Sequence, residues 1–387
     1  MTPKGGGAES VGAGPEILLT TEAGSSRIFF APTARLPDFA DPGRTVVVTD
    51  SLVRRYVPSE YPPGRIVEVP RGEAAKSLSC LQSVYERFLE LGVRRDWFIL
   101  AVGGGSVSDL AGFAASTWMR GLDFGFAPTT VLSMVDASVG GKNGIDFGGY
   151  KNLIGSFRLP RFVLVDPAVL STLPARQAAS GLVEAVKHAV IEGPEHLALL
   201  EQALSVRSPG TPFALPGDPA LLEEVLARSI RVKARIVAAD FRESGDRRKL
   251  NLGHTIGHAV EAVTGLPHGE CVAVGLACAL GLAARRGGRA EDARRVLDLL
   301  GRLGVPRSLE EARLAALADV EARSGLSGAG AILSDPAAYR SEVARALGTD
   351  KKRAGGSVLF ALPRAPGSVE IEPIELAEIE EFVREAP

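Results

Sequence analysis

Three of the five histidines fall within one short stretch of the 387-residue chain, at the spacing of candidate metal ligands. The run NLGHTIGH places His254 and His258 four residues apart, and His268 follows in the run PHGE. If this stretch is helical, His254 and His258 lie on one face. The zinc-protease signature HExxH requires glutamate where this chain has Thr255, so the pattern does not indicate that reaction class.

A carboxylate would complete a catalytic metal site. Two histidines and one distant carboxylate form an open zinc site of the kind that catalyses reactions. Glu184 is the candidate for this third ligand, because it lies in the helix-like run GLVEAVKH upstream of the histidines. The pattern alone does not decide whether the histidines bind a metal ion or are structural.

Several cationic side chains lie in apolar or glycine-rich surroundings, where surface charges are unusual. Any one of them is more often an ordinary solvated side chain. Lys142 in GGKNG, however, is flanked by glycines and follows an acid, Asp136, which favours recognition of an anion such as a phosphorylated acid. The set comprises Arg120, Lys142, Lys151, Lys187, Lys233 and Arg247.

A glycine-rich run, GGGSVSD, connects an apolar run at 98–102 to a helix-like stretch at 106–118. Glycines allow backbone amides to approach a pyrophosphate, and the N-terminus of a helix adds partial positive charge. The spacing is not GxGxxG, so a tight strand-to-helix turn is the alternative to a dinucleotide site. Asp50 ends the upstream run at 45–49, where an acid binds an adenosine ribose or caps a helix.

The elements that would position these residues begin with an α/β half. Up to about residue 175, short β-rich runs alternate with helical patterning, best seen at 75–91. This alternation predicts a parallel sheet with covering helices. The expected strands are 27–31, 45–49, 66–69, 98–102, 124–127 and 162–166.

From about Pro174 onward, long stretches rich in Ala, Leu, Glu and Arg predict helices. They are 175–192, 195–205, 219–240, 254–287, 289–303, 308–323, 338–346 and 374–385, with turn-rich gaps at 208–219 and 324–336 and a β-like run at 357–362. We therefore expect a flexible tail over residues 1–16, a Rossmann-like dinucleotide-binding domain over 17–174, and a mostly helical metal- and substrate-binding domain over 175–387. The active site is expected between the two domains.

Composition excludes several classes of protein. Hydrophobic residues make up 45% and charged residues 23% of the chain, which is typical of soluble globular proteins. A net charge of -2 without a Lys/Arg-rich run gives no basis for nucleic-acid binding, and no apolar run reaches membrane-spanning length. The three cysteines show no CxxC spacing, which fits a cytoplasmic protein, and Cys271 and Cys278 are expected in the core because they lie in an apolar stretch.

Taken together, the motifs resemble one family. The runs GGGSVSDLAGFAASTWMRG, PTTVLSMVDASVGGKNGID, YKNLIG, LVEAVKHAVI, RKLNLGHTIGHAVE and PHGE closely resemble those of the 3-dehydroquinate synthases. The resemblance runs in order from roughly residue 45 to 350–352, and so covers most of the chain.

The resemblance implies roles for particular residues. Glu184, His254 and His268 are similar to the family's metal ligands, which hold zinc or cobalt. The positions similar to those that bind NAD are Asp50, Glu73, Lys76, Gly104, Gly105, Ser106, Asp109, Thr129 and Thr130, adjoined by Asp136, Lys142 and Lys151. The substrate and catalytic positions are Arg120, Asp136, Lys142, Lys151, Asn152, Lys187, Lys233, Arg247, Asn251, His258 and one of Lys351 or Lys352.

The resemblance also implies a reaction. The family converts 3-deoxy-D-arabino-heptulosonate 7-phosphate to 3-dehydroquinate and phosphate, in the shikimate pathway to aromatic amino acids. Its steps are transient oxidation at C5 by NAD, phosphate elimination, reduction, and ring opening with intramolecular aldol closure. The family is homodimeric, with Arg120 expected to reach across a subunit boundary. This sequence departs from the family pattern at Leu52 and Asn143, and neither change removes a catalytic group.

Three other interpretations compete with this one. Other sugar phosphate cyclases, the 2-deoxy-scyllo-inosose, 2-epi-5-epi-valiolone and aminodehydroquinate synthases, use the same chemistry on other sugar phosphates. An iron-dependent polyol dehydrogenase shares the GGGS-x-x-D loop but would not need Lys142, Lys151 and Lys187. A degenerate nucleotide-binding protein without activity should have lost ligands or lysines, and here the set is complete.

Overall fold

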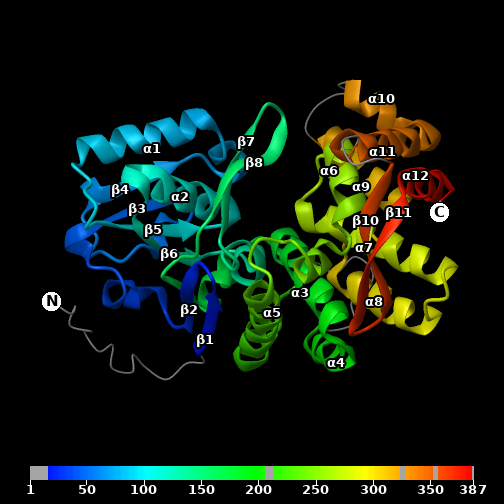
Figure 1. Ribbon diagram of the computed structural model, residues 1–387, viewed down its shortest axis with the longest axis horizontal. Helices are drawn as coiled ribbons and strands as arrows, with labels where there is room; N and C mark the ends of the chain where they lie inside the picture. Colours follow the sequence, from blue (N-terminus) through cyan, green and yellow to red (C-terminus); the bar gives the residue numbers. More distant parts are fainter. Residues whose placement is uncertain (1–15, 205–212, 323–327, 352–355, 386–387) are drawn as a thin grey trace.

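The computed structural model describes residues 16–204, 213–322, 328–351 and 356–385. Within these ranges a sheet-containing half and a largely helical half lie side by side (Figure 1). The fold class predicted from the sequence is confirmed, since a Rossmann-like α/β domain precedes a mostly helical one. None of the helices in these ranges combines the length and hydropathy that crossing a bilayer requires.

A seven-stranded sheet forms the core of the N-terminal half. Its strands are β1 (Glu16–Thr21), β2 (Gly24–Phe30), β3 (Thr45–Asp50), β4 (Ile66–Val69), β5 (Phe98–Gly103), β6 (Asp123–Pro128) and β9 (Phe162–Val165). Their spatial order is β1-β2-β9-β6-β5-β3-β4, and every pair except the antiparallel β1–β2 is parallel. The turns after β3, β5 and β6 therefore meet at one edge of the sheet, where open α/β sheets bind ligands.

Burial explains why these segments are strands. Every residue of β3 and β9 is buried, as expected for central parallel strands covered on both faces. The covering helices include α1 (Leu78–Glu90), which is capped by the Ser77 side chain, and α2 (Gly105–Thr117). Because α2 starts directly after β5 and packs on β5 and β6, the glycine-rich run forms the turn between them.

A two-stranded hairpin projects from the N-terminal half toward the helical half (Figure 1). Its strands are β7 (Lys142–Phe147) and β8 (Tyr150–Phe157), joined through Gly148 and Gly149, which both have positive φ. The sequence analysis did not predict these strands. Most of β8 is exposed, so it lacks the apolar pattern by which buried strands are recognised.

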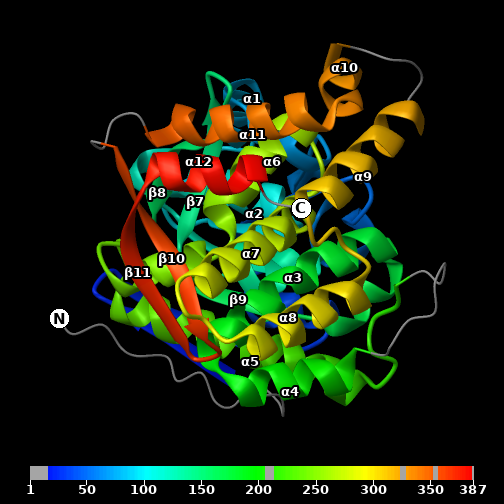
Figure 2. The same ribbon diagram turned by 90° about the vertical axis from the view of Figure 1, so that its right-hand side faces the viewer.

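The C-terminal half is built around α3 (Ala175–Glu192), which is buried without interruption from Ala178 to Val190. The other helices are α4 (Pro194–Ala203), α5 (Pro219–Ala239), α6 (His254–Thr264), α7 (His268–Arg285), α8 (Ala290–Leu303), α9 (Leu309–Ala322), α10 (Gly328–Ser334), α11 (Pro336–Lys351) and α12 (Leu376–Glu385). Helices α4, α5, α7 and α8 all pack against α3. A second hairpin, β10 (Ser357–Ala365) and β11 (Ser368–Glu375), lies along the outer side of the helices (Figure 2).

The expected continuous helical stretch at 254–287 is wrong, because it is two helices. Gly265 ends α6 with a positive φ of 65°, and Pro267 directly precedes α7. Glycine in the left-handed conformation followed closely by proline is a strong helix stop. The break gives His254 and His268 the same position, the first residue of a helix.

Smaller differences concern segment ends. The gap expected at 324–336 contains α10, and the helix expected at 374–385 begins only at Leu376, after the unpredicted strand β11. The tail expected over 1–16 lies outside the described residues except for Glu16, which begins β1.

Helix α7 and the turn before α6 approach closely at a glycine. A Cβ atom at Gly275 would lie 1.8 Å from the carbonyl oxygen of Gly253. We expect Gly275→Ala to lower the free energy of unfolding by about 3 kcal/mol, because the clash exceeds the roughly 1 kcal/mol that alanine gains in a helix. Denaturant unfolding in the presence of a chelator measures this change without a contribution from bound metal.

Gly301 in α8 is the matched control, since a Cβ there would meet only the mobile end of Arg307, at 2.9 Å. Gly301→Ala should be neutral or stabilising. Equal stability of the Gly275→Ala variant and the unmodified protein would contradict this description of the α6–α7 packing.

Candidate metal and anion site

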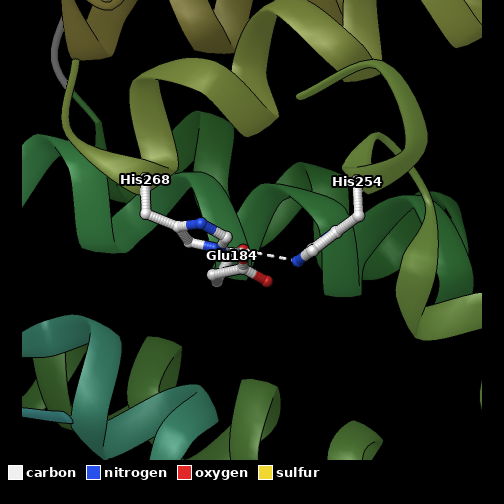
Figure 3. Close-up of side chains that lie close together, drawn as sticks. All are labelled: Glu184, His254 and His268. Carbon is white, nitrogen blue, oxygen red and sulfur yellow. Dashed lines mark ion pairs between the residues drawn. The ribbon is translucent and has the colours of Figure 1, made fainter. Parts of the chain in front are cut away.

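Glu184, His254 and His268 converge from three helices (Figure 3). Glu184 lies in the middle of α3, and the two histidines begin α6 and α7. Nε2 of each histidine is 3.7 Å from Oε1 of Glu184. One potential ligand atom of each residue lies within 4.8 Å of the other two.

The carboxylate of Glu184 is fully buried, and neither of its oxygens accepts a hydrogen bond within the described ranges. The buried ammonium of Lys187, three residues later on α3, forms an ion pair with it. Removing a carboxylate from water costs several kcal/mol unless charges and hydrogen bonds compensate. A cation near Oε1 would therefore stabilise this arrangement.

The two histidine rings are oriented for metal binding. Burial and then the nearby charge of Lys187 hold the pKa of His254 well below its ordinary value, so its ring is neutral and has a free lone pair. Nδ1 of His254 is 3.2 Å from the carbonyl oxygen of Leu252, and Nδ1 of His268 is 3.0 Å from Oε2 of Glu261. Such contacts leave Nε2 of each ring available and are typical of metal-binding histidines.

The dimensions of the group fit zinc or cobalt. Ligand atoms about 2.1 Å from a tetrahedral zinc ion lie roughly 3.4 Å from one another, close to the 3.7 Å between Glu184 and each histidine. With three protein ligands, a fourth position stays open for substrate or water.

Two overlapping groups also bring potential ligand atoms together, His258–Glu261–His268 and Asp136–Glu184–His188. The acid that distinguishes each of them from the first group is paired with a lysine. Glu261 forms an ion pair with Lys151 and contacts His268, while Asp136 accepts a hydrogen bond from Lys233 at 2.6 Å. The first group is therefore the best candidate for a metal site.

Three lysines pair with acids of the opposite half of the molecule. The pairs are Lys142–Glu243, Lys151–Glu261 and Lys233–Asp136. Lys142 and Lys151 come from the β7–β8 hairpin, and their partners belong to the helical half. Burial lowers the pKa of Lys233 to about 8, although Asp136 opposes this. Burial raises the pKa of Glu261, but His268 and Lys151 outweigh it and lower the value to about 2.

The short 3-10 helix Asp246–Asn251 supplies Arg247 and Asn251. Arg247 donates to the carbonyl oxygen of Gly140 at 3.0 Å, which links this helix to the N-terminal half. Asn251 donates to Oε1 of Glu243 at 2.7 Å. A hollow of about 660 Å³ opens beside them, lined by Arg242, Glu243, Arg248, Asn251 and Ser357–Leu359.

The glycine-rich turn lies at the carboxyl edge of the sheet, next to the turn after β6. A Cβ atom at Gly104 would lie 3.2 Å from Cγ2 of Thr130, and a Cβ atom at Gly105 would lie 3.2 Å from Cβ of Ala137. The hydroxyl of Thr129 is buried and has no hydrogen-bond partner in the described part of the chain. The turn thus offers backbone amides, a helix N-terminus and a hydroxyl to a phosphate.

Lys76 links several of the predicted NAD-binding residues to Asn152. Its ammonium is 3.0 Å from Oδ2 of Asp109 and 3.4 Å from Oε1 of Glu73, and it donates to Oδ1 of Asn152. Burial raises the pKa of Asp109 to about 6 despite the charge of Lys76. Asp146 accepts the backbone amide of Asn152 at 2.8 Å and holds that residue at a φ of 53°.

Other predicted residues lie elsewhere or at the edge of the group. Asp50 accepts the amide of Leu52 at 2.8 Å in the turn after β3, and it does not cap the 3-10 helix that follows. Ser106 donates to Glu73 at 3.1 Å. The exposed Arg120 follows α2 at the end opposite the glycine-rich turn, about 20 Å along the helix axis. The structure does not bring Arg120 to the other predicted residues of this chain.

The remaining predicted residues are His258 and the two lysines near the end of α11. The ring of His258 lies 5.3 Å from that of His254 and 5.8 Å from that of His268, measured between centroids. Lys351 is the last residue of α11, and Lys352 lies outside the described residues.

Two acids at this site, Glu243 and Glu261, were not predicted from the sequence. A signal for Glu261 was present, because it follows His254 by seven residues and His258 by three, and so shares their helix face. Glu243 lies in a turn with a positive φ of 61°, and no periodic pattern marks it.

Two family models and a related sequence correspond to the same enzyme family. Residues 66–180 match the 3-dehydroquinate synthase N-terminal family, and residues 181–323 match the 3-dehydroquinate synthase C-terminal family. The chain is 41% identical over 312 residues to the 3-dehydroquinate synthase of Symbiobacterium thermophilum, covering 79% of this chain and 78% of that protein.

Solved structures with the same fold include two sugar phosphate cyclases. The 2-deoxy-scyllo-inosose synthase complexed with carbaglucose-6-phosphate, NAD+ and Co2+ is 24% identical with a TM-score of 0.77, covering 96% of this chain and 100% of that one. The 2-epi-5-epi-valiolone synthase of Streptomyces hygroscopicus with NAD+ and Zn2+ bound is 25% identical with a TM-score of 0.74, covering 97% and 98%.

The choice among the three possible ligand groups can be tested by Co2+ titration. We expect His254→Ala to weaken Co2+ binding by more than the roughly 10- to 100-fold lost when an outer contact of a metal site is removed. His258→Ala should retain binding, because His258 belongs only to a competing group. Retained binding in His254→Ala together with lost binding in His258→Ala would assign the metal to the His258–Glu261–His268 group instead.

Proposed function

Because the chain belongs to the 3-dehydroquinate synthase family, we propose that Glu184, His254 and His268 hold one zinc or cobalt ion and that NAD binds at the glycine-rich turn. The chain is a lyase that forms 3-dehydroquinate and phosphate from 3-deoxy-D-arabino-heptulosonate 7-phosphate. One observation supports the residue assignment above the others. A buried carboxylate faced by two histidines lies beside lysines from both halves of the molecule.

When bound, NAD would accept and return a hydride, and the metal ion would polarise substrate oxygens as a Lewis acid. The protein has to bind and orient both partners of that exchange. Gly104, Gly105 and Thr129 would hold the pyrophosphate of NAD, since they border the start of α2. Lys76 would orient Asn152 toward the substrate through the hydrogen bond that joins them.

The lysines would bind the phosphate and the carboxylate of the substrate. Lys142 and Lys151 are placed on an exposed hairpin that faces the helical half, so they can exchange their carboxylate partners for substrate oxygens. Oxidation at C5 makes the proton on C6 acidic, and the phosphate on C7 then leaves by β-elimination. The C6–H and C7–O bonds break, a C6–C7 double bond forms, and a phosphate oxygen takes the proton. His258 and Asn251 would orient the hydroxyls of the remaining chain for ring closure.

A homodimer is part of the proposal, because Arg120 lies far from the other substrate-binding candidates of its own chain. An exposed arginine at that position can serve the site of a second copy related by two-fold symmetry. A cytoplasmic location is also proposed, supported by three free, buried cysteines among the described residues.

The reaction is tested by following phosphate and 3-dehydroquinate together, with the heptulosonate phosphate, NAD and Co2+ or Zn2+ supplied. We expect equal amounts of both products and no net NADH, because the hydride returns to the substrate in each turnover. A chelator should abolish both products, and added metal should restore them. Net NADH equal to the substrate consumed would favour a dehydrogenase.

The assignment of Arg120 is tested by mixing two variants that are each inactive, Arg120→Ala and Lys142→Ala. If Arg120 serves the partner's site, each mixed dimer contains one site that retains both residues. An equal mixture allowed to exchange subunits should recover about a quarter of the unmodified activity. If mixed dimers isolated with two different tags show no recovered activity, Arg120 serves the site of its own chain and the assignment is wrong.

A further inference from the structure

Glu261 contacts two groups that belong to different parts of the site. It lies on α6, and its side chain is only 10% exposed. One carboxylate oxygen, Oε2, is 3.0 Å from Nδ1 of His268, and the other, Oε1, forms an ion pair with Lys151. The same carboxylate thus contacts a candidate metal ligand and a candidate substrate-binding lysine.

The contact with His268 determines how that ring faces Glu184. With the hydrogen on Nδ1 and donated to Glu261, the lone pair on Nε2 is directed toward Glu184, 3.7 Å away. A carboxylate in this position also makes the imidazole a more basic ligand. His254 differs, because its Nδ1 faces the backbone carbonyl of Leu252 and does not depend on another side chain.

The contact with Lys151 joins the two halves of the molecule. Lys151 lies on β8 of the projecting hairpin, whereas Glu261 belongs to the helical half. When Lys151 turns to a substrate anion, Glu261 loses one partner and its charge acts more strongly on His268. Glu243 differs from Glu261. It pairs with Lys142 and Asn251, and no contact described here joins it to His254 or His268.

We propose that Glu261 is a positioning residue that orients the metal ligand His268 and couples it to the substrate-binding Lys151. The inference rests on the metal site proposed above and adds to it. It predicts two separable defects in a Glu261 variant, weaker metal binding through His268 and weaker substrate binding through Lys151.

Three variants of the full-length protein separate these effects. Glu261→Gln keeps the shape of the side chain and removes its charge, Glu261→Ala removes both contacts, and Lys151→Ala removes only the second. Glu201→Gln is the matched control, because Glu201 is a similarly ion-paired carboxylate, bound to Arg295 far from the metal group. Co2+ affinity is measured by chelator competition without substrate, together with the visible absorption of the Co2+-loaded protein, KM and kcat.

We expect Glu261→Gln to weaken Co2+ binding about tenfold, Glu261→Ala to weaken it further, and both to change the Co2+ absorption spectrum. At saturating Co2+, both should raise KM more than they lower kcat. Lys151→Ala should raise KM without weakening Co2+ binding, and Glu201→Gln should leave affinity and spectrum unchanged. Thermal unfolding of the metal-free proteins identifies any variant that fails to fold, and the near-isosteric Glu261→Gln then carries the test.

Affinity and spectrum in both Glu261 variants that match the unmodified protein would overturn the inference. So would an equal loss in Glu201→Gln, since the effect would then not be specific to Glu261. If the unmodified protein binds no Co2+, the metal site itself is wrong, and this failure is distinct because it appears before any variant is compared.

Discussion

The buried carboxylate of Glu184 is the constraint on which the rest of the site depends. It lies on a helix that is buried without interruption from Ala178 to Val190, and no described residue donates a hydrogen bond to it. Lys187 compensates part of its charge. The imidazoles of His254 and His268, when neutral, direct lone pairs toward the same carboxylate. The lone pair of a neutral imidazole is repelled by a carboxylate that it faces, and a cation between them removes this repulsion. The break between α6 and α7 makes this geometry possible, since it starts two helices with histidines that face α3.

The ion pairs between the two halves are weaker than the interactions around the buried Glu184. The side chains of Lys142 and Lys151 are 52% and 53% exposed, although those of Glu243 and Glu261 are only 21% and 10% exposed. Because solvent reaches the lysines, these ion pairs contribute little, about 1 kcal/mol each. A substrate phosphate can therefore replace Glu243 and Glu261 as partners at little cost. In the proposed function, the metal ligands would stay fixed within one packed domain while the hairpin residues exchange partners. This division suits an enzyme that has to bind and release a phosphate in every turnover.

The sequence predicted the structure best where the side chains are buried. The run 66–69 and the stretch 175–192 match a strand and a helix at both ends, because their apolar side chains are buried against the core. The hairpin at 142–157 was missed, since its glycines, lysines and exposed positions give no periodic pattern. Residue types and spacing supplied the metal and cation candidates, and the family resemblance selected Glu184, His254 and His268 from them as ligands. Glu243 and Glu261 did not follow from it, because their role depends on tertiary contacts with lysines of the other half.

The most direct test of the central claim is anomalous diffraction at the cobalt absorption edge from crystals of the Co2+-loaded protein. The account predicts one strong anomalous peak among Glu184, His254 and His268, about 2.0–2.2 Å from an oxygen of the acid and from Nε2 of each histidine. Absence of a peak there, or a peak between His258 and Glu261 instead, would contradict the account.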